Sequence, residues 1–216
     1  MPSLFKKSDL TVCKWISRAQ RILETVFNNK NAIGSLEIFE KNISDLTEAE
    51  KRISTAIIRV NHSGEIAAQG LYMGQALLAR DDEVFEFLLE SAAEEVQHLR
   101  WCIERLKQLD EKESFFTPFW LAGSIAIGFV AALPGDKFSL GFISETEKQV
   151  AEHLQDCLRR VSPNDSLTIQ IMRRMQQDEI GHGDAANNKG GLNLPPLLKV
   201  AMAGQAMIMK ELSARI

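Results

Sequence analysis

The stretch EEVQH at residues 94–98 places a glutamate and a histidine three positions apart, at Glu95 and His98. A second stretch, DEIGH at 178–182, repeats that spacing with Glu179 and His182. Residues three apart share one face of a helix, so each pair can contact a common point. The repeat is suggestive by itself, and the sequence around it decides what it means.

Both pairs lie on helical stripes that are otherwise apolar. An unpaired carboxylate on an inward face is costly, so it must pair, hold a proton or bind a metal. The two pairs are therefore unlike ordinary charged surface. The stripe through the first pair contains Leu88, Ala92, Leu99 and Cys102, and the stripe through the second contains Met172, Met175 and Ala186.

Two further helices each place one glutamate on a similar stripe. Glu65 stands between Ile58 and Tyr72, and Glu147 stands among apolar residues from Ile143 to Leu158. Each of these glutamates precedes the next Glu-x-x-His by about thirty residues, so the chain has two similar halves. A Glu from each of two helices and Glu-x-x-His from each of two others is the ligand arrangement of ferritin-like di-metal bundles.

The order of segments predicts an all-α protein, a ferritin-like four-helix bundle. A capping box at Thr47 and Glu50 opens the first helix. An uncharged segment, 114–135, stands where such a bundle needs its long crossover between helices two and three. We expect an N-terminal amphipathic and linker segment at 1–45 and the ferritin-like domain at 46–216. The bundle helices are expected at about 46–80, 81–112, 139–161 and 166–188.

Composition narrows the class of protein further. The chain is 45 % apolar and 25 % charged, with a net charge of −4, as in a soluble globular domain. No basic stripe indicates nucleic-acid binding. The uncharged segment 114–135 approaches the length of a membrane span, but Pro118 and three glycines interrupt or end it. An interfacial or buried helix is favoured there.

Four carboxylates and two imidazoles form an oxygen-rich ligand set that suits iron or manganese better than structural zinc. Six side chains leave open positions on two metals, as catalysis requires.

Four motifs then carry a family resemblance that covers about 50–216. The stretches RVNHSGE at 59–65, EEVQH at 94–98, ETEKQVAEH at 145–153 and DEIGH at 178–182 resemble the four motifs of the demethoxyubiquinone hydroxylase family.

The resemblance implies two iron ions, with Glu95 and Glu179 bridging both, and O₂ as co-substrate. It also implies hydroxylation of the ring of a 2-polyprenyl-3-methyl-6-methoxy-1,4-benzoquinol in ubiquinone biosynthesis, with electrons from an external reductant such as NADH. The chain departs from the family at two positions. Family members often have Asp where this chain has Asn61, and they have a His-Tyr pair where this chain has His153 and Leu154. The implied iron ligands are Glu65, Glu95, His98, Glu147, Glu179 and His182.

Two other functions stay open at this point: a ferritin-like iron storage or detoxification protein, and a non-enzymatic membrane-binding helical protein. His153 has two open roles, a proton relay or an ordinary polar-face histidine. The expected partners are the quinol, a membrane surface and other proteins of ubiquinone biosynthesis. We expect a peripheral protein on the cytoplasmic face of the cell membrane, if the source is bacterial.

The long substrate tail is the reason for that location, because each buried CH₂ contributes about 0.8 kcal/mol to keeping the tail in the bilayer. The quinol is expected to pass between the crossover and the last helix toward Glu147 and Glu179. The expected membrane anchor is the aromatic start of the crossover, Phe115, Phe116, Phe119 and Trp120.

Overall fold

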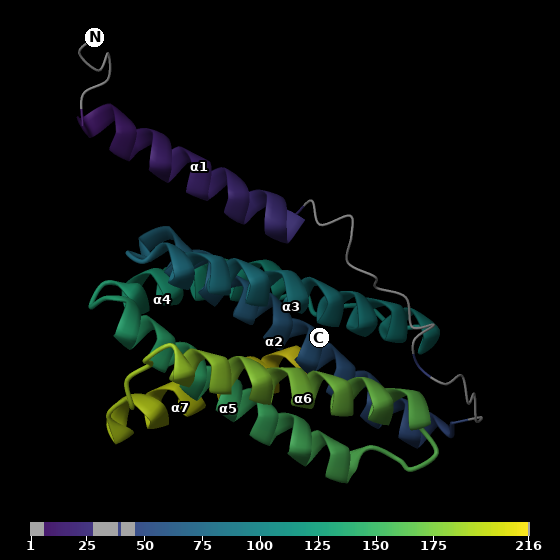
Figure 1. The fold of residues 1–216 in the computed structure, drawn as a ribbon. Coiled ribbons are helices and arrows are strands. Elements are labelled where there is room, and N and C mark those ends of the chain that lie inside the picture. Colours follow the sequence, from purple (N-terminus) through teal and green to yellow (C-terminus); the bar gives the residue numbers. More distant parts are fainter. Residues whose placement is uncertain (1–6, 28–38, 40–45, 216) are drawn as a thin grey trace.

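Four long helices run side by side and form the body of the molecule (Figure 1). The computed structural model describes residues 7–27, 39 and 46–215, and no strand occurs within them. The predicted all-α bundle is therefore confirmed. Its helices are α2 (Glu48–Leu78), α3 (Asp82–Gln108), α5 (Asp136–Arg160) and α6 (Ser166–Asn188).

Side-chain caps start three of the four bundle helices. Thr47 and Glu50 form the predicted capping box of α2, in which each side chain bonds to the other residue's backbone. Asp81 caps α3 by accepting a hydrogen bond from the Glu83 amide, and Asp165 caps α6 by accepting from the Thr168 amide. These caps sit in short connections, so α2 and α3 form one antiparallel hairpin and α5 and α6 another.

The uncharged segment forms α4 (Thr117–Ala132), which connects the two hairpins as predicted. Pro118 stands in the first turn, where a helix needs no amide donor, so it does not interrupt the helix. The glycines within α4 do not end it either. A Cβ on Gly128 would lie 2.3 Å from the Leu71 carbonyl oxygen, and one on Gly74 would lie 2.2 Å from the Ile125 oxygen. Glycine lets α4 and α2 approach backbone to backbone.

Besides α4, two of the described helices lie outside the four-helix bundle. α7 (Pro196–Ser213) packs against α2 and α5, and α1 (Lys7–Phe27) packs against α2 and α3. Arg18 of α1 pairs with Asp82 and stacks over the Phe85 ring at 4.5 Å. The rest of the expected N-terminal segment, residues 1–6, 28–38 and 40–45, lies outside the described residues. The domain boundary between residues 45 and 46 stays a prediction.

The bundle interior has an apolar cluster toward each end and a polar layer between them. One cluster gathers around Tyr72, Leu88 and Ile143, and the other around Ile58, Met172 and Met175. Each bundle helix contributes residues to both clusters, and its predicted ligand residues lie between those two groups along the helix. The apolar packing on both sides fixes the rotation of the helices and so directs the polar side chains toward one another.

The described part of the chain contains no helix with both the length and the apolar character to cross a bilayer. α4 has 16 residues, which at 1.5 Å per residue is shorter than the hydrocarbon core of about 30 Å. Large apolar side chains are nevertheless exposed on α4 and α7. They include Phe115 and Phe119 at the start of α4, Phe129 and Val130 near its end, and Leu197, Val200, Met207 and Ile208 on α7.

Candidate metal centre

The six predicted ligands lie in the polar layer of the bundle, and all six are buried. α2 and α5 contribute one glutamate each, and α3 and α6 contribute one Glu-x-x-His pair each. Glu95 is fully buried, and Glu147 and Glu179 are each 1 % exposed. Burial of this degree is rare for carboxylates without a partner of opposite charge.

Four of the six residues, Glu65, Glu95, His98 and Glu179, offer ligand atoms that all lie within 4.8 Å of one another. His182 adjoins the same group, because its Nδ1 lies 3.3 Å from Glu95 Oε1 and 3.4 Å from Glu179 Oε2. The acidic residues of the first and second halves of the sequence therefore share one centre. Their spacing matches a site in which metal ions sit between the side chains.

Several buried oxygen and nitrogen atoms of this centre lack hydrogen bonds, and they indicate which kind of ligand it binds. Glu95 Oε1, both carboxylate oxygens of Glu179 and His182 Nδ1 are buried; they lie within ion-pair distance of neighbouring side chains, but none of them makes a well-aligned hydrogen bond among the described residues. Buried polar atoms almost always have partners, so four such atoms at one point require an explanation. They are oxygen and nitrogen donors around a common point, and a bound metal would satisfy them. The residues present thus fit a metal site.

Each histidine presents one ring nitrogen to the centre and the other to an acidic residue. His98 Nδ1 lies 3.0 Å from Glu95 Oε2, and its Nε2 lies 3.1 Å from Asp178 Oδ2. His182 Nδ1 faces the centre in the same way, and its Nε2 lies 2.8 Å from Glu94 Oε2. Carboxylates on the outer nitrogen of a metal-binding histidine fix the ring orientation and the tautomer.

The sequence interpretation missed Glu94 and Asp178, although a signal was present. Each of these acidic residues comes directly before the glutamate of one Glu-x-x-His pair. In the bundle each supports the histidine of the opposite helix, Glu94 of α3 that of α6 and Asp178 of α6 that of α3. The residue before the motif could have been selected by its charge, but its partner lies across the helix interface.

Tyr72, which shares the apolar stripe of Glu65, is a core residue that is 1 % exposed. Its hydroxyl also donates a hydrogen bond of 2.7 Å to Glu147 Oε1. The bond holds the glutamate of α5 in one orientation beside the centre. Tyr72 therefore has a second role that its apolar neighbours in the sequence did not indicate.

Proton affinities in the centre follow from burial and from neighbouring charges. Burial and then the Glu95 charge raise the pKa of Glu65, and burial and then the Glu179 charge raise the pKa of Glu147. Burial opposes ionisation of Glu95, but the charge on His98 outweighs it and lowers the pKa of Glu95. Burial likewise opposes the charge on His98, but Glu95 raises its pKa overall. A metal must compete with protons for such carboxylates, so binding of a metal here would depend on pH.

α5 has Glu145 two residues before the implied ligand Glu147. The structure places Glu147 in the polar layer, while Glu145 Oε2 pairs with Lys199 Nζ on α7 at 2.8 Å. The helical stripe therefore selected the inward residue. Two other histidines lie outside the centre: His62 lies 3.6 Å from Glu113, and His153 Nε2 lies 3.5 Å from Cys157 Sγ. Burial lowers the pKa of His153 to about 4.

A largely apolar cavity of about 260 Å³ leads from the centre toward α7. Glu65 lines its inner end, and Leu71, Phe142 and Met202 belong to its walls. Neither Glu147 nor Glu179 lines this cavity, and the expected approach of the quinol toward those two residues stays a prediction. The opening lies between α2 and α5 under α7, because the helices leave Glu65 facing that side.

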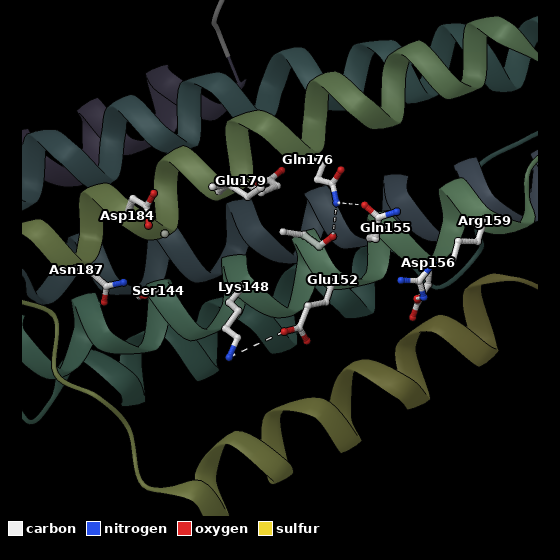
Figure 2. A pocket seen from close by; sticks show the side chains of 13 residues that line it. Ser144, Lys148, Glu152, Gln155, Asp156, Arg159, Gln176, Glu179, Asp184 and Asn187 are labelled. Carbon is white, nitrogen blue, oxygen red and sulfur yellow. Dashed lines mark hydrogen bonds and ion pairs between the residues drawn. The ribbon is translucent and has the colours of Figure 1, made fainter.

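A second, polar groove of about 640 Å³ lies between α5 and α6 (Figure 2). Glu179 is in its wall, with the ion pair of Lys148 and Glu152 nearby and Gln176 hydrogen-bonded to the Ala151 carbonyl. The centre therefore adjoins an apolar cavity through Glu65 and a polar groove through Glu179.

Comparison with known proteins places these features in a family. The family described as "Ubiquinone biosynthesis protein COQ7" matches residues 52–213. A 3-demethoxyubiquinol 3-hydroxylase of Xanthomonas campestris is 43 % identical over 91 % of this chain and 91 % of its own. The protein of that name from Coxiella burnetii is 44 % identical over 92 % of each chain, and that from Ralstonia pickettii 45 % identical over 81 % of each.

Proposed function

This chain belongs to the COQ7 family of ubiquinone biosynthesis proteins, and we propose that its buried centre holds two iron ions at which demethoxyubiquinol is hydroxylated. The protein is a 3-demethoxyubiquinol hydroxylase, as the family and its relatives establish. Neither iron storage nor a non-enzymatic role has support from these relatives. What remains to propose is the metal, the oxidant, the reductant and the place of the reaction in the cell.

The observation that carries the metal assignment is the set of buried donor atoms without well-aligned hydrogen bonds at one point. Four carboxylates, Glu65, Glu95, Glu147 and Glu179, balance the charge of two divalent ions, and His98 and His182 complete the set. Oxygen-rich sets with imidazole suit iron. When bound, two iron ions would activate O₂ so that one oxygen atom enters the ring and the other becomes water, with two electrons from a reductant such as NADH.

The protein side chains have their own tasks in this reaction. Asp178 and Glu94 hold the two imidazoles with Nδ1 toward the centre, and Tyr72 holds Glu147. The walls of the apolar cavity exclude water around the ring. The cavity of about 260 Å³ suits a substituted ring and leaves no room for a polyprenyl tail. The tail must therefore leave through the mouth beside α7.

We further propose that the protein is peripheral, on the cytoplasmic face of the cell membrane if its source is bacterial. α7 lines the cavity with Met202 and Met209, and it exposes Val200 and Ile208 elsewhere on its surface. Exposed apolar groups beside the mouth support contact with a bilayer that keeps the substrate tail. Other proteins of ubiquinone biosynthesis are candidate partners at this surface.

The membrane proposal is tested with Phe115 and Phe119, which are 72 % and 64 % exposed. Trp120 is unsuitable for the test, because its indole Nε1 donates a hydrogen bond to Ser213 and joins α4 to α7. Changing both phenylalanines to Ser should release the protein from liposomes and slow turnover of long-tailed quinols more than of short-tailed ones. Leu23→Ser on α1 is the matched control. Unchanged liposome binding in the double variant would refute the proposal.

The function itself is tested by mass spectrometry of quinones from cells that lack this protein. Accumulation of the demethoxy precursor, reversed by the wild-type gene, is the expected result. Purified protein should bind two iron ions per chain and hydroxylate a short-tailed demethoxyubiquinol with O₂ and a reductant. Normal ubiquinone content in the deleted cells would contradict the assignment, and a protein without affinity for Fe(II) would contradict the metal.

A further inference from the structure

Asn61 is a buried amide in the wall of the apolar cavity. It lies on α2 one turn before Glu65, and only 4 % of the residue is exposed. Both residues line the same cavity. The Asn61 Nδ2 atom has no hydrogen-bond partner among the described residues. A polar group therefore stands beside the metal centre with a donor that the fold does not use.

A buried donor without a partner destabilises a fold, so such donors are rare unless a ligand satisfies them. Ala68, Leu71 and Phe142 in the wall offer the amide no acceptor. The wall also contains polar residues (Ser124, Thr146, Gln149, Glu152, His153, Asp156, Gln205 and Lys210), and two of them already donate elsewhere. Thr146 Oγ1 donates to the Phe142 carbonyl, and Gln149 Nε2 donates to Glu145 and to the Lys199 carbonyl.

The cavity and the amide together define the chemistry of a ligand. A volume of about 260 Å³ with apolar walls takes a flat ring with small substituents. The two N–H groups of an Asn amide select an acceptor, and a ring oxygen of a quinol or quinone supplies one. A hydrocarbon ring of the same shape would leave the donor unpaired, and that loss gives a site its discrimination.

We propose that Asn61 binds a ring oxygen of the substrate through Nδ2 and so fixes the orientation of the ring beside Glu65. Hydroxylation at one ring carbon requires one orientation, and apolar walls alone do not distinguish the positions of a flat ring. The identity of the ring as a demethoxyubiquinol rests on the proposed function. The preference for an oxygen-bearing ring rests on the cavity and the amide.

The test compares binding of two probes to the iron-loaded full chain: tetramethyl-1,4-benzoquinone and 1,2,4,5-tetramethylbenzene, a flat ring with the same four methyl groups in which two C–H groups replace the two carbonyls. Calorimetry should show a preference for the quinone of about tenfold in wild type, the size of one well-placed hydrogen bond. Asn61→Leu should abolish this preference and leave iron content unchanged. Asn61→Ala repeats the test with a smaller side chain, should the Leu variant not fold.

Gln69→Leu is the matched control. Gln69 is also a buried amide of α2, with Nε2 unpartnered among the described residues, but it does not line the cavity. Its variant should keep the wild-type preference for the quinone. A preference that survives in both Asn61 variants, or that disappears equally in Gln69→Leu, would overturn the proposal, as would a wild type with no preference.

Hydroxylation is measured separately, so that the two proposals fail separately. A wild type that prefers the quinone through Asn61 but does not hydroxylate demethoxyubiquinol refutes the function and supports the binding role. A wild type that hydroxylates with equal efficiency and equal regioselectivity when Asn61 is replaced refutes the binding role and supports the function. The expected result for Asn61→Leu is a raised KM and a loss of selectivity between ring positions.

Discussion

The two halves of the metal centre have the same motif and different surroundings. His98 of the first half is 1 % exposed, and its supporting Asp178 is also held by Arg174 at 3.0 Å. His182 of the second half is 7 % exposed, and the side chain of its supporting Glu94 is 61 % exposed. The first half meets the apolar cavity through Glu65, whereas the second meets the polar groove through Glu179.

This difference separates what the motif supplies from what the surroundings supply. Glu-x-x-His on a helix supplies ligands to either half equally, because the spacing is a local property of the helix. Burial, supporting bonds and access come from neighbouring helices. We therefore expect the first half to be the more rigid one, on the substrate side, and the second half to be the one through which water and protons pass.

The largest expected effect follows from removing either histidine. His98→Ala and His182→Ala should each lower hydroxylation by more than about a hundredfold, because each residue is one of two nitrogen donors in the centre. Iron analysis should show a loss of bound iron, and circular dichroism should show nearly unchanged helix content. Full activity in one variant alone would break the equivalence of the two halves.

A second large effect separates neighbouring glutamates of α5. Glu147→Gln should reduce bound iron and activity, because Glu147 faces the centre and is held by Tyr72. Glu145→Gln is the control; it removes an ion pair with Lys199 and should keep iron content and most activity. Iron measured per chain decides between them. Exchanged phenotypes would show that α5 has a different register from the one described.

An intermediate effect is expected at the residues behind the histidines. Asp178→Asn should weaken Fe(II) binding by about 10- to 100-fold, since it orients a fully buried imidazole. Glu94→Gln should weaken it by less, because water can replace an exposed carboxylate. Competition with a coloured chelator gives both affinities. Equal losses would remove the distinction between a rigid and a solvated half.

The smallest effect is expected from Tyr72→Phe, which removes only the hydroxyl that donates to Glu147. One neutral hydrogen bond contributes about 1 kcal/mol, so iron affinity should fall about fivefold, in the second half of the centre. Fe(II) titration of the variant, with Phe85→Leu as a control from the same apolar cluster, measures this change. A loss as large as that of Asp178→Asn would mean that Glu147 depends on Tyr72 far more than one bond implies.

Much of the site could be predicted from the sequence, for a physical reason. Helical periodicity decides which residues share a face, and apolar neighbours decide that the face is buried. These two local rules placed Glu147 on the inward face, and the spacing of Thr47 and Glu50 located the capping box of α2. The order of motifs also predicted the crossover at 114–135, where α4 now connects the hairpins.

Tertiary structure decided the contacts between helices. The sequence alone determined an all-α bundle, two Glu-x-x-His pairs on inward faces and a family resemblance that the relatives confirm. It did not determine that Asp178 supports His98, that Trp120 bonds to Ser213, or that the cavity reaches Glu65 and not Glu147. The 3.6-residue period of a helix determines which side chains share a face of that helix. Contacts between side chains of two helices depend in addition on how far each helix is rotated and shifted against its neighbours.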